Sequence, residues 1–174
     1  PDAPGLYLGQ SLLLAGRFEE ARASAADSVA MYLHLGKRRE AAYAVITLGQ
    51  CHQHQGGYRA AHISAEEGLA LAEKTDFPRG VGMALGLMGA IALADGAYEE
   101  ALSRCEESLA VWQRSIGHPS EFEGELACLG LAARTIGHRD DAWKHIVSQL
   151  AWAQESQLLM PILFGLSSIA LLLA

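Results

Sequence analysis

Apolar residues recur with the spacing of α-helices along the whole chain, and no stretch alternates strictly between apolar and polar residues. The third cycle shows the pattern clearly: residues 81–94 are apolar and small, and Asp95-Gly96 ends them. A second helix then begins at Tyr98, with two glutamates in the first turn, where the helix dipole favours negative charge. The same pattern predicts first helices at about 5–15, 39–55, 79–94, 120–136 and 158–174, and second helices at about 18–35, 58–74, 98–116 and 139–155.

Small residues recur in three registers that keep step over four cycles. The glycines that end the first helices recur with a nearly constant period, at Gly16, Gly56, Gly96 and Gly137. A second register lies seven residues earlier, at Gly9, Gly49, Gly89 and Gly130, and a third lies five residues later, at Ala21, Ala61, Ala101 and Ala142. The period indicates a stacked array in one continuous domain, 1–174, with repeats at about 5–36, 38–76, 78–117 and 119–157 and a half-repeat at 158–174.

The registers inside the helices predict that two antiparallel helices approach closely in each cycle. A glycine inside a helix costs about 1 kcal/mol relative to alanine, so its recurrence suggests that a Cβ there would clash. An aromatic residue stands two positions after three of the turn glycines, at Phe18, Tyr58 and Tyr98. We expect these rings to cover the gap between one hairpin and the next helix. Arg139 holds the fourth position and departs from the pattern.

These residues resemble tetratricopeptide repeats. The family's pattern of small residue, glycine, aromatic residue and alanine fits the first three cycles, and the fourth fits without its aromatic residue. The resemblance implies an all-α fold, an α-solenoid with a right-handed superhelix of antiparallel hairpins, four repeats and one extra C-terminal helix. The period of about 40 residues, longer than the family's usual period of about 34 residues, resembles the arrays of bacterial signalling ATPases and transcription activators. It implies a non-catalytic scaffold or sensor, a fragment of a larger cytoplasmic regulatory protein.

The resemblance also implies a partner surface, because the first helices of such arrays line a concave groove. The positions near the small register on these helices are expected to bind a peptide or helix: Gln10, Leu13, Tyr43, Ile46, Gln50, Gln53, His54, Met83, Gly86, Ala90, Leu93, Leu131 and Arg134. This lining is apolar and rich in amides, which suits an apolar segment better than an acidic tail. Each of these residues could equally pack against a neighbouring helix.

Composition narrows the class of partner. Hydrophobic residues make up 51% of the chain and charged residues 19%, which is too apolar for disorder. The net charge is −7, and it argues against direct binding of nucleic acid. The short basic cluster Lys37-Arg38-Arg39 is expected to be an exposed loop. Three cysteines without a CxxC pair fit a reducing, cytoplasmic compartment.

No motif for catalysis or for a cofactor stands out. Cys51 and His54 share one face of a helix, as do His138 and His145, but two ligands do not make a zinc site. The acidic pairs lie mostly at helix starts, where dipole and solubility roles explain them. There is no GxxxxGK[ST] loop that could bind phosphates. We therefore predict neither an enzyme nor a metal or cofactor site.

Residues 158–174 carry no charge. A membrane span needs about 20 apolar residues, whereas this run is shorter and is interrupted by Pro161 and Gly165. We expect a buried helix that opens a fifth repeat, and we do not expect a membrane anchor. Its uncovered face could make a homodimer, and the small residues Gly86 and Ala90 could admit a small effector. A self-association module and a small-ligand sensor therefore remain alternatives to the interaction array.

Overall fold

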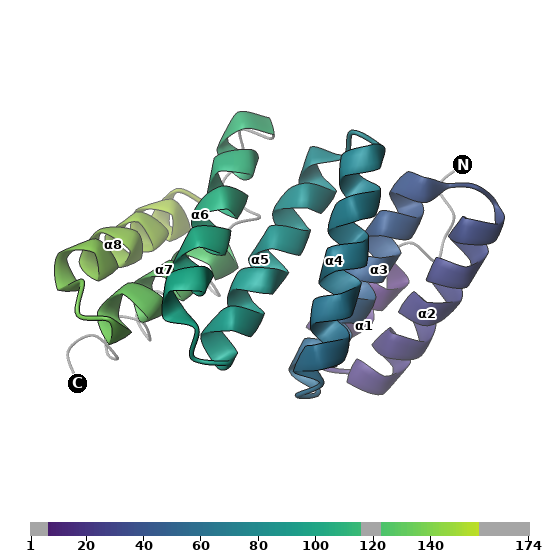
Figure 1. Cartoon of the computed structure of the whole chain (residues 1–174), viewed down its shortest axis with the longest axis horizontal. Helices are drawn as coiled ribbons and strands as arrows, with labels where there is room; N and C mark the ends of the chain where they lie inside the picture. Colours follow the sequence, from purple (N-terminus) through teal and green to yellow (C-terminus); the bar gives the residue numbers. More distant parts are fainter. Residues whose placement is uncertain (1–6, 116–122, 157–174) are drawn as a thin grey trace. The chain divides into compact units, whose positions relative to one another are not determined.

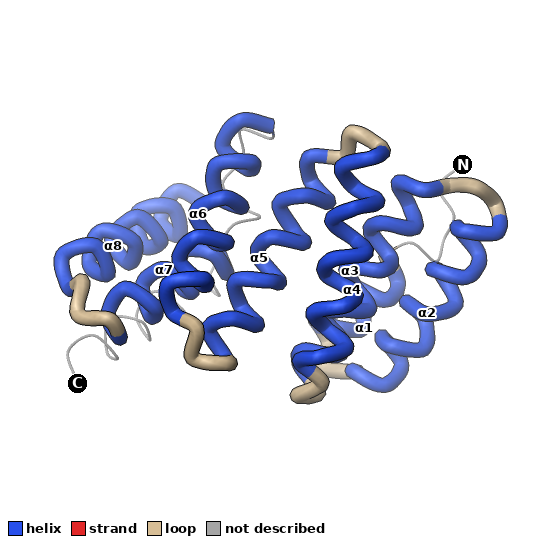
Figure 2. The backbone as a smooth tube through the Cα atoms, in the orientation of Figure 1, coloured by secondary structure: helices blue, strands red, loops and turns tan. Residues whose placement is uncertain are grey.

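The computed structural model of the chain describes residues 7–115 and 123–156, and every regular element in these ranges is an α-helix (Figure 1, Figure 2). The eight helices of these ranges are α1 (Leu8–Leu14), α2 (Phe18–His34), α3 (Arg38–His54), α4 (Tyr58–Lys74), α5 (Pro78–Ala94), α6 (Tyr98–Ser115), α7 (Glu123–Thr135) and α8 (Arg139–Ser156). Consecutive helices pack as antiparallel neighbours. The predicted all-α class of helix hairpins is therefore confirmed.

The chain forms two compact units, Pro1–Leu87 and Met88–Ala174, and α5 contributes residues to both. In the N-terminal unit, α1 packs against α2, α2 against α3 and α3 against α4, and α1 also contacts α3. In the C-terminal unit, α7 packs against both α6 and α8. The right-handed superhelix remains a prediction, and the helix predicted at 158–174 lies outside the described residues.

Glycines with positive φ angles end the first helices, because only a residue without a Cβ adopts this conformation freely. The φ angles are 73° at Gly16, 76° at Gly56, 78° at Gly96 and 88° at Gly137. At Gly96, the next amide, that of Ala97, donates to the carbonyl of Ala92 at 2.9 Å and closes the helix end.

A second set of left-handed residues lies in the joints between hairpins, and the sequence pattern did not reveal it. Gly36 has a φ of 68°, and Asp76, at the equivalent position of the next repeat, has a φ of 47°. Aspartate is one of the few residues with a side chain that tolerates this region. The joints therefore repeat the same turn with different residues.

The small registers lie where the helices of a hairpin approach closely. A Cβ built on Gly49 would lie 3.3 Å from the carbonyl oxygen of Ala61, and one on Gly89 would lie 3.4 Å from that of Ala101. These two alanines are fully buried. The nearest atoms to such a Cβ belong to side chains, Cδ2 of Leu87 at 2.8 Å for Gly49 and Sγ of Cys105 for Gly89, so side chains of other helices occupy the space that a side chain at these glycines would need.

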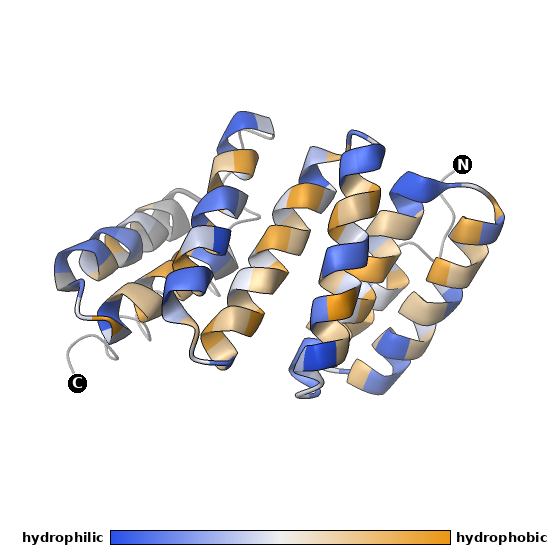
Figure 3. Cartoon of the chain, viewed as in Figure 1, coloured by the Kyte–Doolittle hydropathy of each residue, from blue (hydrophilic) through white to orange (hydrophobic). Residues whose placement is uncertain are grey.

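Small side chains also dominate the core of each unit. In the N-terminal unit, Leu13, Ala21 and Cys51 form one cluster. In the C-terminal unit, Cys105, Leu129 and other residues of α5, α6 and α7 form another. Figure 3 shows that hydrophobic residues occupy most of the length of α5. In the described part of the chain, however, no helix is both long and apolar enough to span a membrane.

Candidate functional site

Three residues of the predicted partner surface belong to the core of the N-terminal unit. Ile46 is fully buried, and its Cγ1 lies where a Cβ on Gly68 of α4 would be. Leu13 is buried in the cluster with Cys51. Tyr43 is also buried, and its ring meets that of Tyr7 edge to face with centroids 5.5 Å apart. For these three positions the structure favours helix packing over a partner surface, since their side chains are already covered.

Two glutamines of the predicted surface have a different environment. Gln10 on α1 and Gln50 on α3 are half-buried and hold the same register position, one repeat apart. The amide oxygen Oε1 of each side chain is buried and accepts no hydrogen bond from any described residue. A buried acceptor without a donor costs about 1–3 kcal/mol. Two equivalent unmatched acceptors on neighbouring helices are consistent with a surface that a donor group completes.

The remaining predicted residues lie partly open. Gln53 is half-buried, and exposed His54 stacks on the ring of Phe18 with centroids 5.3 Å apart. On α5, half-buried Met83 and Gly86 belong to the N-terminal unit, whereas half-buried Ala90 and Leu93 belong to the C-terminal unit. Leu131 and Arg134 on α7 are also half-buried. The predicted surface is thus divided between two units, and the N-terminal unit holds all three of its glutamines.

Residues 81–120 match the family model of the tetratricopeptide repeat. They are a tetratricopeptide repeat. The matched stretch is as long as the spacing between Gly56 and Gly96, and it contains most of α5 and all of α6. None of the curated proteins matches the chain. A tetratricopeptide repeat suggests a protein-interaction module and is typically non-catalytic, so the partners suggested for this chain are proteins.

Cys51, which resembles a metal ligand in the sequence, lies in the core of the N-terminal unit. Cys51 is fully buried against Leu13 and Ala21, and burial raises the pKa of its thiol. Burial lowers the pKa of neighbouring His52, which favours its neutral form. Within the described ranges, no three His, Cys, Asp or Glu residues gather in a geometry that could hold a metal ion.

A buried carboxyl group in the C-terminal unit was not anticipated from the sequence. Oε1 of Glu125 on α7 accepts hydrogen bonds from Oγ of Ser108 at 3.0 Å and from Nε1 of Trp112 at 3.3 Å. Burial raises the pKa of Glu125, and these two bonds offset the shift only in part. The sequence does contain a signal for its burial. Glu125 stands at the repeat position that Ala44 and Ala84 hold in the earlier repeats.

Two thiols converge near the middle of the tetratricopeptide repeat. Sγ of Cys105 lies where a Cβ on Gly89 would be, and Sγ of Cys128 lies 3.6 Å from the carbonyl oxygen of Gly89. A hydrogen bond with Cys128 and burial raise the pKa of Cys105. The Cys105 thiol is therefore held in its protonated form, and its sulfur atom explains why glycine stands at this register position.

Proposed function

We propose that the chain is a non-catalytic interaction array and that the first helices of its N-terminal unit bind a peptide segment. The single observation that carries this proposal is the pair of unmatched amide oxygens on Gln10 and Gln50. A peptide backbone supplies N–H donors in a regular row, and the half-buried residues around the glutamines supply apolar contact.

The spacing of these acceptors suits an extended peptide. Packed helices lie about 8–10 Å apart, and an extended chain rises about 3.3 Å per residue. Oxygens at the same position of α1 and α3 would therefore match N–H groups about three residues apart on the peptide, which face the same side when the extended segment has the three-residue turn of polyproline II. A helical partner offers no such row, because its backbone donors are used internally. We therefore prefer an extended segment among the peptide partners.

The broader role is part of the same proposal. A regulatory protein of the cytoplasm, similar to bacterial signalling ATPases that carry such arrays, fits the long period of the repeats and the three free cysteines. The alternative of a homodimer concerns residues 158–174, which lie outside the described ranges. No observation favours a small-ligand sensor over a peptide-binding surface.

Selection of peptides on the immobilised chain, for example by phage display, tests the proposal. Peptides that bind should lose affinity by about tenfold to a hundredfold in the double variant Gln10→Ala/Gln50→Ala, because each hydrogen bond contributes about 0.5–1.5 kcal/mol. The control is Gln113→Ala on α6, an exposed glutamine outside the surface. Peptides that bind the double variant as tightly as the parent chain would refute the assignment.

Stability provides an independent check on the same residues. Gln50→Leu replaces an unmatched buried oxygen with apolar atoms, so we expect the free energy of unfolding to rise by up to about 1 kcal/mol. Function would then be lost while stability increases, as occurs where a binding site is not optimised for folding. A marked loss of stability in Gln50→Leu would show instead that this glutamine has a structural role.

A further inference from the structure

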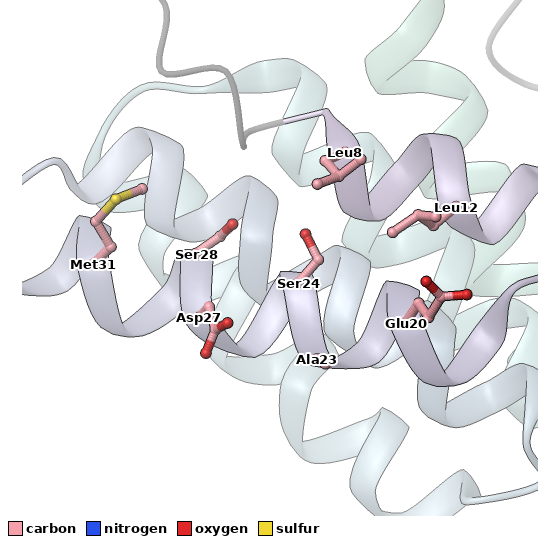
Figure 4. A pocket seen from close by; sticks show the side chains of 8 residues that line it. All are labelled: Leu8, Leu12, Glu20, Ala23, Ser24, Asp27, Ser28 and Met31. Carbon is pink, nitrogen blue, oxygen red and sulfur yellow. The ribbon is translucent and has the colours of Figure 1, made fainter.

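The joint between α2 and α3 presents an exposed patch that is both apolar and basic. We call it the joint patch, and it consists of Leu33, Leu35, Lys37, Arg38 and Arg39. Leu33 is 45% exposed and Leu35 is 57% exposed, and the three cations are exposed as well. The patch lies past the hollow between α1 and α2 that Figure 4 shows, because the lining of that hollow ends at Met31 on α2.

Backbone hydrogen bonds hold this joint in one conformation. The N–H of Lys37 donates to the carbonyl of Tyr32 at 2.9 Å. The N–H of Gly36 donates to the carbonyl of Leu33 at 3.1 Å. Tyr32 is itself buried and packs against Ala41 of α3. The backbone of the joint patch is therefore ordered before a partner arrives, which reduces the entropy that binding costs.

The other repeats show that leucine is not needed at these positions for folding. The positions of Leu33 and Leu35 are polar one and two periods later, where they hold Glu73 and Thr75, then Gln113 and Ser115. Glu73 and Gln113 are exposed, so the openness of this position is a property of the repeat and does not depend on the residues that precede α1. An exposed apolar pair in this joint alone is consistent with contact with a partner.

The cations of the joint patch are placed against the electrostatic preference of a helix. The N-terminal end of the helix dipole disfavours cations, and α2, α6 and α8 each carry two acidic residues in the first turn. Helix α3 begins with two arginines instead, and Glu40 stands three residues after Lys37. Although Arg17 pairs with Glu20 at the same spacing, none of the three cations of the patch forms an ion pair with a described residue. These cations thus favour an anion that the described residues do not supply.

One of the cations is positioned by the next joint. Cζ of Arg39 lies 4.7 Å from the centroid of the Phe77 ring, a cation–π contact. This contact restricts a long side chain that would otherwise lose more freedom on binding. A guanidinium group on a ring still presents the N–H groups of its edge, and their geometry matches a carboxylate.

We propose that the joint patch binds a short acidic segment of a partner protein in which an apolar residue accompanies the carboxylates. The carboxylates meet the three cations, and the apolar side chain packs on Leu33 and Leu35. Anionic membranes are bound by clusters of about 4–8 Lys or Arg residues, which this joint does not have. The net charge of −7 also opposes a nucleic acid. The patch shares no residue with the glutamine surface, so the proposal does not depend on it.

The probe is a short fluorescein-labelled peptide with glutamates around two central leucines and serines elsewhere. Its matched control has glutamine at every glutamate position. Fluorescence anisotropy with the full chain should show at least about tenfold tighter binding of the acidic peptide, and added salt should reduce the difference. The net charge of the chain opposes the acidic peptide, so this preference would report a local basic surface. Equal affinity of the two peptides would overturn the proposal.

Substitutions locate the site. Arg38→Gln should weaken binding of the acidic peptide by about tenfold, because a charge-assisted hydrogen bond is lost. Leu35→Thr should weaken it by a few-fold, and it introduces the residue that the second joint already has at this position. The matched control is Arg59→Gln, which removes an exposed cation from the first turn of α4, at the other end of the hairpin. Its affinity should equal that of the parent chain. If Arg59→Gln weakens binding as much as Arg38→Gln does, the peptide responds to net charge alone and the proposal fails.

Urea unfolding separates a role in binding from a role in folding. Arg38→Gln should leave the unfolding midpoint unchanged or raise it, because it removes a cation from the N-terminal end of a helix. A marked fall of the midpoint would assign Arg38 to the stability of the joint and overturn its role in binding.

Three further measurements concern the place and the kind of occupant. Amide chemical shifts of the unsubstituted chain should change at the joint patch and at Phe77 when the acidic peptide is added, and changes confined to the C-terminal unit would contradict the proposal. Vesicles of phosphatidylcholine with and without phosphatidylserine test a lipid surface. Binding to the anionic vesicles that Arg38→Gln abolishes would assign the patch to a membrane. Sedimentation without peptide tests a second copy, and a dimer that Arg38→Gln dissociates would likewise overturn the proposal of an acidic partner segment.

Discussion

The contact between α3 and α4 permits a quantitative test of why small residues recur in these helices. A Cβ added at Gly68 would overlap Cγ1 of Ile46 and lie 3.3 Å from its Cδ1. Ile46 is fully buried, so its side chain has no open space into which to move. Overpacking of this kind costs about 1–3 kcal/mol, whereas alanine gains about 1 kcal/mol over glycine in a helix. We expect Gly68→Ala to lower the free energy of unfolding by about 1 kcal/mol.

The partner substitution reverses the expected sign. Ile46→Ala alone should cost about 2–5 kcal/mol, because it leaves a cavity. In that background the new methyl group of Gly68→Ala enters the cavity, so it should raise stability by about 1 kcal/mol. The double-mutant cycle therefore has a coupling energy of about 2 kcal/mol, well above the usual deviation from additivity.

Urea unfolding followed by circular dichroism measures all four corners of the cycle. Gly9→Ala is the matched control, because its Cβ would meet its nearest atoms at 3.4–3.5 Å, which is ordinary contact. It should leave stability unchanged or raise it by up to about 1 kcal/mol. If Gly68→Ala were stabilising in both backgrounds, Ile46 would not limit the space at Gly68, and the explanation of the small residues would be wrong.

Three further predictions follow from buried groups. Ala101→Leu should lower the free energy of unfolding by about 1–3 kcal/mol in urea titrations, since Ala101 is fully buried; an unchanged midpoint would contradict this. Burial raises the pKa of Glu125, so its contribution to stability is complete below the ordinary carboxyl pKa of about 4.3 and is lost as the pH rises through the raised value. Glu125→Gln should therefore be more stable than the parent near neutral pH and lose this advantage in acid, and parallel pH profiles would disprove it. Cys51, Cys105 and Cys128 are buried, and the pKa values of Cys51 and Cys105 are raised, so maleimide should label none of the three thiols within minutes in the native protein and all three in denaturant.

The sequence predicted the helices well because their boundaries depend on local chemistry. Turn glycines require positive φ angles, and they recur visibly, so the ends of the first helices could be placed within a few residues. The alanine register was also readable, since a small residue at a fixed position of every repeat implies close backbones. The positive φ angle of Asp76 could not be predicted in this way, because aspartate is common in many turns. Only the φ angle itself reveals that Asp76 is equivalent to Gly36.

The partner surface was harder to predict, because periodicity shows which residues share a face of a helix but not which neighbour covers that face. Ile46 and Gln50 lie four residues apart on α3, yet Ile46 is enclosed by α4 while Gln50 retains an unmatched oxygen. The difference depends on the rotation of one helix against another. Glu125 was missed for a different reason. Acidic side chains are rarely buried without partners, so its residue type predicted an exposed position, whereas the side chain is buried.

The joints between hairpins suggest how the array tolerates such departures. In the first joint, Tyr32 of α2 fills the space beside Ala41 and Ala44. In the second, Ala72 replaces the tyrosine, and a Cβ on neighbouring Gly80 would meet both Ala72 and the ring of Phe77, so an aromatic residue of the joint itself lies beside this position.

In the third joint, the aromatic residue is again on the second helix, as Trp112. Its indole N–H donates to Glu125, which stands where the earlier repeats have an alanine. The first and third joints thus use a ring at the same position of the second helix, Tyr32 and Trp112, whereas the second joint uses Phe77 of the joint itself, which indicates that the repeats preserve volume and spacing more strictly than residue identity. A carboxyl group fits the third joint because the indole N–H and the hydroxyl of Ser108 give it donors. No described residue gives the amide oxygens of Gln10 and Gln50 such a donor, and this contrast is the physical reason to propose that a partner supplies one.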